Sequence, residues 1–126
     1  MQEKTRKNKE LGDVGEHIAC LYLEGLGFRI LDQNVRYKMG EIDIVAQKGN
    51  DLHFIEVKTR SNSSFAMPLD SITKAKKTRM KRAAQIYICS RKDFKDNNLP
   101  PCFIDVISID CSFGKPEIEL IVDAIK

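Results

Sequence analysis

The apolar residues of the chain change their spacing several times, and each change predicts a different element. A first segment, from about Lys9, repeats apolar residues every three or four positions and stops at Gly25 and Gly27, which predicts a helix. The apolar positions of this helix are Leu11, Val14, Ile18, Leu21 and Tyr22. Residues 1–10 are polar and expected to be flexible, which leaves 11–126 as one domain.

Short apolar and β-branched runs follow this helix and predict three strands, over 28–31, 40–46 and 52–59. The last two runs are separated by the sequence KGND, which is typical of a turn. Two later runs, over 102–109 and 117–122, predict the strands that complete the sheet.

A second helix is expected between these two groups of strands. Residues 60–69 have loop composition, and Asp70 or Ser71 can then cap a helix that ends near Ser90. Its inner side is expected to carry Ile72, Ala75, Met80, Ala83, Ala84 and Tyr87. The resulting order, α-β-β-β-α-β-β, predicts an α/β fold with a mixed central sheet flanked by helices.

Composition agrees with one globular domain, because 42% hydrophobic and 31% charged residues in a chain of 126 provide material for a core. The sequence has neither a membrane-spanning apolar run nor the apolar centre of a signal peptide, so a cytoplasmic protein without membrane association is expected. The four cysteines form no CxxC pair and no zinc-like cluster, and they are expected to be reduced thiols in the core.

The sequence FIEVKTR, residues 54–60, places charged side chains in a strand whose other residues are typical of a core. If residues 48–51 form the hairpin loop, antiparallel pairing places Asp43 directly opposite Glu56. Two carboxylates in these positions repel each other, so a positive charge is expected between them. Lys58 shares the face of Glu56 because side chains alternate along a strand.

A hard divalent cation, Mg²⁺ or Mn²⁺, suits this pair of carboxylates. Asp43 and Glu56 would bind the ion, while Lys58 would position the attacking water and offset phosphate charge, so the pattern predicts a site that cleaves phosphodiesters. The alternative is a surface strand on which Glu56 and Lys58 are solvated or paired with each other. Apolar residues on both faces of these strands argue against that alternative.

Glu16 adds a third carboxylate, in the first predicted helix. Its helical neighbours Gly12, Ala19 and Cys20 are small, so close packing of the helix at this point would direct Glu16 toward the sheet. The alternative is an ordinary glutamate that faces solvent.

Three motifs carry a resemblance to a known family: GEHIA at 15–19, GEIDIVA at 40–46 and FIEVKTR at 54–60. Together they are similar to the YraN-like family, which looks like a branch of the PD-(D/E)xK nuclease superfamily. The resemblance implies a restriction-endonuclease-like fold and a Mg²⁺-dependent endonuclease acting on DNA, with Holliday junction resolvases among its relatives. It also implies catalytic roles for Asp43, Glu56 and Lys58, and for Glu16 as an additional ligand or water contact.

The second predicted helix contains a run of positive charge, KAKKTRMKR at 74–82, with six basic residues and no acidic one. Taken alone, such a run is more often a solvated helix face. Beside a phosphodiesterase site it is expected to bind nucleic acid phosphates. The expected contacts are Lys74, Lys77, Arg79, Lys81, Arg82 and Gln85 on this helix, with Arg36 before the Asp43 strand and Arg60 after the Lys58 strand.

Two functions from different classes therefore remain open. One is a metal-dependent nuclease whose partner is DNA, with a homodimer as one option for cutting two strands. The other is a non-catalytic nucleic-acid-binding module that retains the nuclease fold. The complete set of Asp43, Glu56 and Lys58 favours the first, because a binding module has no need of the local repulsion.

Overall fold

The computed structural model describes residues 2–60, 72–91 and 99–125, with side chains from Lys9 onward. Apart from Arg60, the predicted loop at 60–69 and the two predicted cap residues after it lie outside the described residues. The predicted order of elements is confirmed. The elements are α1 (Gln2–Gly25), β1 (Arg29–Tyr37), β2 (Gly40–Lys48), β3 (Asp51–Arg60), α2 (Lys74–Ser90), β4 (Cys102–Asp110) and β5 (Glu117–Ile121).

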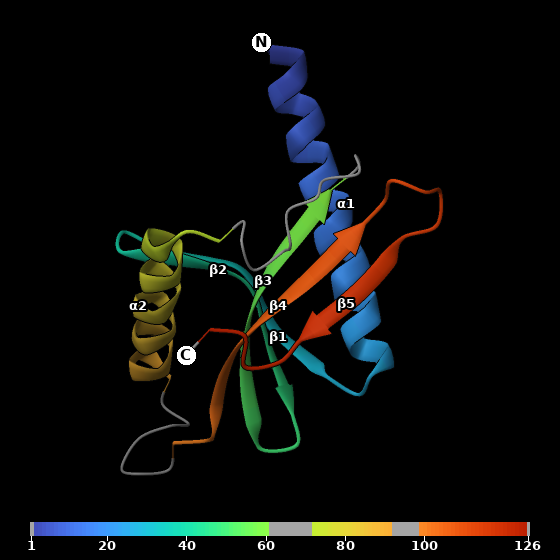
Figure 1. The fold of residues 1–126 in the computed structure, drawn as a ribbon. Coiled ribbons are helices and arrows are strands. Elements are labelled where there is room, and N and C mark those ends of the chain that lie inside the picture. The colour runs from blue at the N-terminus through green and yellow to red at the C-terminus, as the bar shows by residue number, and fades with distance from the viewer. Residues whose placement is uncertain (1, 61–71, 92–98, 126) are drawn as a thin grey trace.

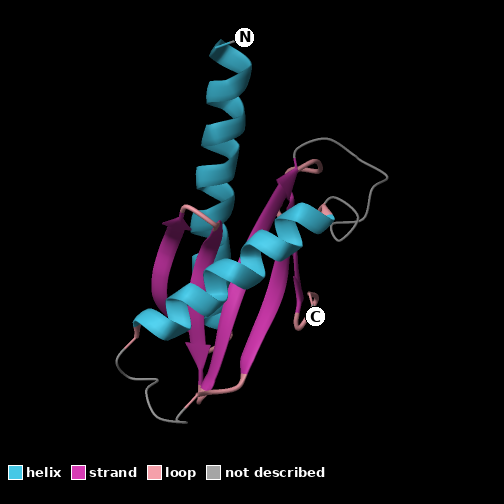
Figure 2. Ribbon diagram, turned by 90° about the vertical axis from the view of Figure 1, so that its left-hand side faces the viewer, coloured by secondary structure: helices cyan, strands magenta, loops and turns pink. Residues whose placement is uncertain are grey.

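The five strands form one mixed sheet in the order β1-β2-β3-β4-β5. Only β3 and β4 are parallel, and α2 lies in the connection between them, while the other neighbours are antiparallel. The two helices cover opposite faces of the sheet, as the two views in Figures 1 and 2 show. The predicted α/β class is confirmed, and the arrangement is consistent with the restriction-endonuclease-like fold.

The central strands are apolar on both faces because each face is covered by a helix. The pair Ile44 and Ile55 is fully buried and packs with Leu23 of α1. The next pair, Val45 and Phe54, is also fully buried and packs against the inner side of α2. The core is therefore divided into two clusters, one on each face of the sheet.

Two glycines allow the helices to approach the sheet closely. A Cβ atom at Gly15 of α1 would lie 1.9 Å from Oγ1 of Thr59 on β3. A Cβ atom at Gly40 of β2 would lie 2.0 Å from the carbonyl oxygen of Arg79 on α2. Any larger residue at either position would force the elements apart. Both contacts lie next to acidic residues, Glu16 and Glu41.

A buried polar pair ties β3 to β4. The Nδ1 atom of His53 lies 2.5 Å from Oδ2 of Asp105, and both side chains are buried. The second oxygen of Asp105 accepts a hydrogen bond of 2.8 Å from the backbone amide of Asp123, beyond β5. His53 and Asp105 thus satisfy each other's hydrogen-bonding groups within the sheet, and Asp105 also fixes the segment that follows β5.

Helix α1 begins at Gln2 and has 24 residues, so it starts earlier than the apolar pattern indicated. The additional turns are polar, and a polar helical segment lacks the periodicity on which the prediction depended. Across the three described ranges, no helix is both long and apolar enough to cross a membrane.

Several other sequence predictions need correction. Strand β1 extends to Tyr37 rather than ending at residue 31, because an edge strand with mostly exposed side chains shows no apolar pattern. Helix α2 is capped by Thr73, whose side chain accepts a 3.1 Å hydrogen bond from the amide of Lys76. The core placement was wrong for three residues, since Ala75, Cys89 and Cys102 are exposed.

Candidate active site

The sheet divides where β2 and β3 part. The predicted register is confirmed over five pairs, the last of which is Ile44 with Ile55. Beyond that pair, β2 continues beside β1 alone and β3 continues beside β4 alone. Asp43 and Glu56 are the first residues of the two arms past this fork. Figure 1 shows the arms separating, with β2 turning toward α2.

Asp43 joins the two arms through its side chain. Its Oδ2 atom accepts a hydrogen bond of 2.8 Å from the backbone amide of Val57. The side chain thus takes over where the backbone ladder between β2 and β3 ends. This bond fixes the carboxylate beside Glu56, the residue before Val57.

Glu56 is the most buried acid of the fork, with 4% of its surface exposed. Its Oε1 atom lies 3.7 Å from Nζ of Lys58 and 3.8 Å from Nζ of Lys76. No hydrogen-bond donor among the described residues reaches the buried Oε2 atom. Burial is the main cause that raises the pKa of Glu56, followed by the negative charge of Asp43 and a hydrogen bond with that residue. The positive charges of Lys76 and Lys58 oppose these effects, and the resulting pKa is about 8.

Lys76 is a site residue that the sequence interpretation missed. Its Nζ atom lies 2.8 Å from Oε1 of Glu41, which the sequence also left without a role. Burial lowers the pKa of Lys76, but the bond to Glu41 and the charge of Glu56 outweigh this and raise it above its usual value. One signal was present, since Lys76 precedes the buried Met80 and Ala83 by four and seven positions and thus shares their helix face.

Glu16 also faces the site, as its small helical neighbours predicted. Burial and the negative charge of Asp43 raise its pKa, while a hydrogen bond from Asn34 and the charge of Arg36 oppose the shift. With Lys58, Glu16 lines a depression of about 270 Å³ between α1 and β3. The four predicted catalytic residues therefore come from three elements and meet at the fork.

The donor set fits a hydrated magnesium or manganese ion. Within the described ranges, no group of three or more His, Cys, Asp and Glu side chains is arranged as a metal site. Mg²⁺ commonly uses only one or two carboxylates and completes its shell with water and phosphate oxygens. Asp43 and the unsatisfied Oε2 of Glu56 supply this minimal set.

The sequence model of the Uncharacterised protein family UPF0102 matches residues 15–109, from Gly15 in α1 almost to the end of β4. The chain belongs to the UPF0102 family. A UPF0102 protein of Geotalea daltonii is 43% identical to it and aligns over 97% of this chain and 94% of its own length. One from Dehalococcoides mccartyi is 41% identical, over 93% of each chain. The predicted resemblance to YraN-like proteins is thereby confirmed.

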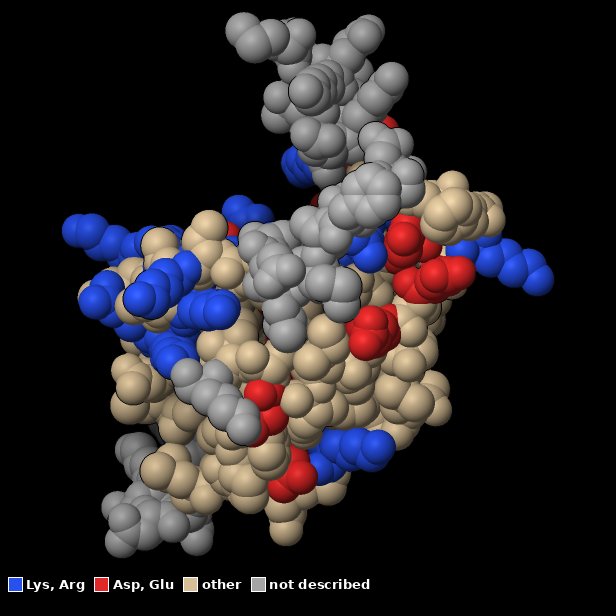
Figure 3. Space-filling view, in the orientation of Figure 1, with Lys and Arg blue, Asp and Glu red and all other residues tan. Residues whose placement is uncertain are grey.

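The basic residues on α2 of this UPF0102 protein differ in how far they are exposed and in which direction they point. Lys76 turns inward to the acids, whereas Lys74, Arg79, Lys81 and Arg82 are exposed and Lys77 is half-buried. Figure 3 shows Lys and Arg side chains gathered over α2. The run is therefore a surface feature adjoining the site, with one member belonging to the site itself.

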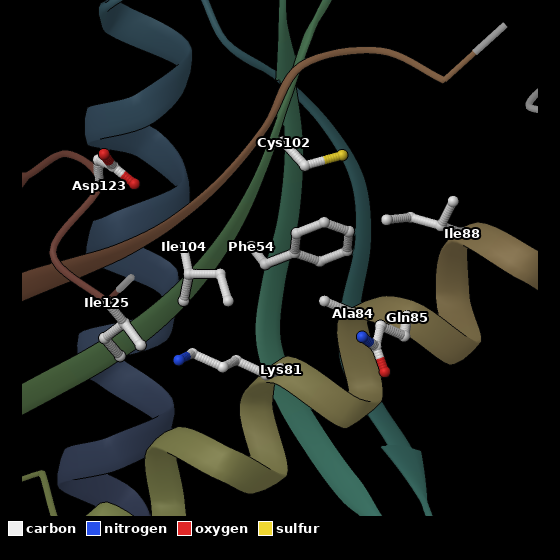
Figure 4. A pocket seen from close by; sticks show the side chains of 9 residues that line it. All are labelled: Phe54, Lys81, Ala84, Gln85, Ile88, Cys102, Ile104, Asp123 and Ile125. Carbon is white, nitrogen blue, oxygen red and sulfur yellow. The ribbon is translucent and has the colours of Figure 1, made fainter. Parts of the chain in front are cut away.

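The remaining predicted phosphate contacts lie at different distances from the fork. Arg36 is close enough to influence the pKa of Glu16, whereas Nε of Arg60 lies 3.7 Å from Asp110, which balances part of its charge. Gln85 lies nine residues beyond Lys76, about 13 Å along the helix axis. With Lys81 it lines a separate, largely apolar depression of about 340 Å³ (Figure 4). In this UPF0102 structure, Gln85 is not brought to the site.

Proposed function

We propose that this UPF0102 protein is a metal-dependent phosphodiesterase that cuts DNA, including branched or otherwise structured DNA. The observation that supports the proposal most is the environment of Glu56. Its buried carboxylate faces Asp43, has one oxygen without a donor among the described residues, and lies 3.7 Å from Lys58. One or two carboxylates are the usual protein ligands of Mg²⁺ in sites that act on phosphates, and the adjacent lysine can offset phosphate charge.

Each residue of the site has a distinct task in this proposal. Asp43 is oriented by the Val57 amide and, together with Glu56, would hold a divalent ion. When bound, such an ion lowers the pKa of coordinated water and offsets charge that develops on the phosphate. Lys58 orients the water or the phosphate, and Glu16 holds a water or accepts a proton at the side of α1. The main binding energy comes from α2 cations on backbone phosphates.

The choice of DNA as substrate rests on the family resemblance together with the exposed cations of α2. A homodimer would provide the two sites that cleavage of both strands of a duplex requires. Backbone contacts alone do not distinguish sequences, so we expect any preference among substrates to concern the shape of the DNA. Substrates of different shape can be compared directly.

A cleavage assay tests the proposal. Duplex, single-stranded, flap and four-way DNA are incubated with the protein and Mg²⁺ or Mn²⁺, and parallel reactions contain a chelator. We expect metal-dependent cleavage of at least one substrate, lost in Glu56→Gln and in Lys58→Met with binding largely kept. Glu119→Gln, an exposed carboxylate on β5, is the matched control and should cut normally. Binding without cleavage under all conditions would instead support the non-catalytic module.

A further inference from the structure

Lys76 forms a bridge between the two arms of the fork. Its Nζ atom is 2.8 Å from Glu41 on β2 and 3.8 Å from Glu56 on β3, although the residue itself belongs to α2. The side chain is 23% exposed, against 5% for Glu56, so the ammonium reaches from the surface into the site. It is the α2 cation that contacts both acids within the described part of the chain.

We infer that Lys76 is a displaceable counter-cation, which occupies the position beside Glu56 until a nucleic acid phosphate draws it away, so that metal and substrate bind cooperatively. The inference rests on the proposed function and extends it, because it assigns a regulatory role to a residue outside the Asp43, Glu56 and Lys58 set.

The first step of the argument is electrostatic. A divalent ion held by Asp43 and Glu56 would lie within several ångströms of the Lys76 ammonium, which is 3.8 Å from Glu56. At a separation of about 6 Å, the repulsion between a unit charge and a divalent ion weakens ion binding by about tenfold, even with the dielectric constant of water. Lys76 and the ion therefore compete for the same carboxylate.

The second step concerns what ends the competition between Lys76 and the ion for Glu56. Lys76 lies in the first turn of α2, between Lys74 and Lys77, which are proposed to bind phosphates. The long side chain of Lys76 can rotate from Glu56 toward a phosphate without movement of the helix. Glu41 can keep the Lys76 ammonium near the surface. A phosphate that binds Lys76 thus removes positive charge from the metal position. By linkage, the ion strengthens nucleic acid binding by the same factor.

Isothermal titration of the full-length protein with Mn²⁺ tests the first step. Lys76→Met should bind Mn²⁺ about tenfold more tightly than the wild type, because the competing charge is gone. Lys76→Arg retains the charge and should stay near the wild-type affinity. Lys77→Met, an equal charge loss one position away, is the matched control and should change affinity much less. Unfolding curves establish that each variant is folded. Equal or weaker Mn²⁺ binding in folded Lys76→Met would overturn the inference.

The second step is tested by repeating the titration with a short DNA duplex present, in a Lys58→Met background so that the DNA stays intact. The duplex should tighten Mn²⁺ binding, and this gain should be about tenfold smaller when Lys76→Met is added. An undiminished gain would overturn the coupling between the two ligands. Mn²⁺ binding that depends on Asp43 but not on Lys76 would contradict only this inference. Wild-type protein that binds no Mn²⁺ would contradict the proposed function as well.

Discussion

The carboxylate of Asp43 accepts a 2.8 Å hydrogen bond from the backbone amide of Val57, the residue that follows Glu56. This bond lies just past the last backbone pair between β2 and β3. It holds together two arms that otherwise pair only with their outer neighbours, and it sets two carboxylates side by side. Asp43 therefore has a structural role and a proposed metal-binding role at once.

The two roles of Asp43 can be separated by two substitutions. Asp43→Asn can still accept the Val57 bond, removes the repulsion with Glu56, and should leave the metal-free protein at least as stable as the wild type. Asp43→Ala leaves the amide without its acceptor and should be less stable than Asp43→Asn by about 1–3 kcal/mol. Urea unfolding in the presence of a chelator measures the difference. Equal stability of the two variants would show that the hydrogen bond contributes little.

The pKa of Glu56 predicts how the stability of the metal-free protein depends on pH. Because folding raises this pKa from 4.5 to about 8, the folded state binds the proton more tightly than the unfolded state. The contribution to stability is fully present below pH 4.5 and is lost as the pH rises through 8. Unfolding free energies of the wild type should therefore fall across this range, and Glu56→Gln should fall less.

Glu119→Gln serves as the control for this pH series, since Glu119 is exposed on β5. It should keep the wild-type dependence on pH. A wild-type stability that is flat between pH 5 and 8, or one that falls equally in Glu56→Gln, would mean that Glu56 is ionised without cost in the fold.

Much of the fold was predictable from local patterns. The central strands carry continuous apolar runs, and the register predicted for the hairpin between them is the one observed. Asp43 was predicted directly opposite Glu56, but the backbone pairing ends one position earlier, at Ile44 and Ile55, and the two acids lie just beyond it. The four-residue turn assumed for this hairpin is shorter in the structure, where Lys48 pairs with Asp51. Shortening a hairpin loop by one residue at each end does not change the register of the strands.

The residues that the sequence did not reveal depend on contacts between distant segments. Lys76 and Glu41 are 35 positions apart, and their ion pair exists because α2 packs closely over Gly40. A charged residue on a helix is expected to face solvent by default. For Lys76, only the spacing of four positions from the buried Met80 indicated that its side chain points inward. Tertiary packing therefore places the ion pair of Lys76 and Glu41 beside Glu56.

Gly15 should be essential for the position of α1. A Cβ atom there would meet Oγ1 of Thr59 at 1.9 Å, so Gly15→Ala must displace the helix or the strand, and overpacking of this kind costs about 1–3 kcal/mol. Gly12→Ala, one turn earlier, meets nothing within 4 Å and should be neutral or stabilising, as expected for alanine in a helix. Thermal or urea unfolding of both variants measures the difference. A Gly15→Ala protein as stable as Gly12→Ala would contradict the close contact.

The exposed cations of α2 should determine how nucleic acid binding responds to salt. Lys74→Ala, Arg79→Ala and Arg82→Ala together should weaken binding and reduce the slope of log K against log[salt] by about 0.7–0.9 for each lost phosphate contact. Losses should be similar for unrelated sequences of one shape, because phosphate contacts carry no sequence information. Fluorescence anisotropy over a salt series gives the slope.

A second triple variant controls for the loss of net charge. Arg29→Ala, Lys48→Ala and Lys115→Ala remove three exposed cations that lie outside α2. This variant should keep nearly the wild-type slope. Equal effects of the two triple variants would mean that α2 has no special part in binding.

The claim that Asp43 and Glu56 form a divalent-cation site is tested most directly by anomalous diffraction from crystals soaked in Mn²⁺. One anomalous peak should lie about 2.0–2.3 Å from a carboxylate oxygen of each residue, at the fork between β2 and β3. Crystals of Asp43→Asn soaked in the same way should lose or weaken the peak. Absence of a peak in the wild type at saturating Mn²⁺, or a peak coordinated only by other residues, would contradict the account.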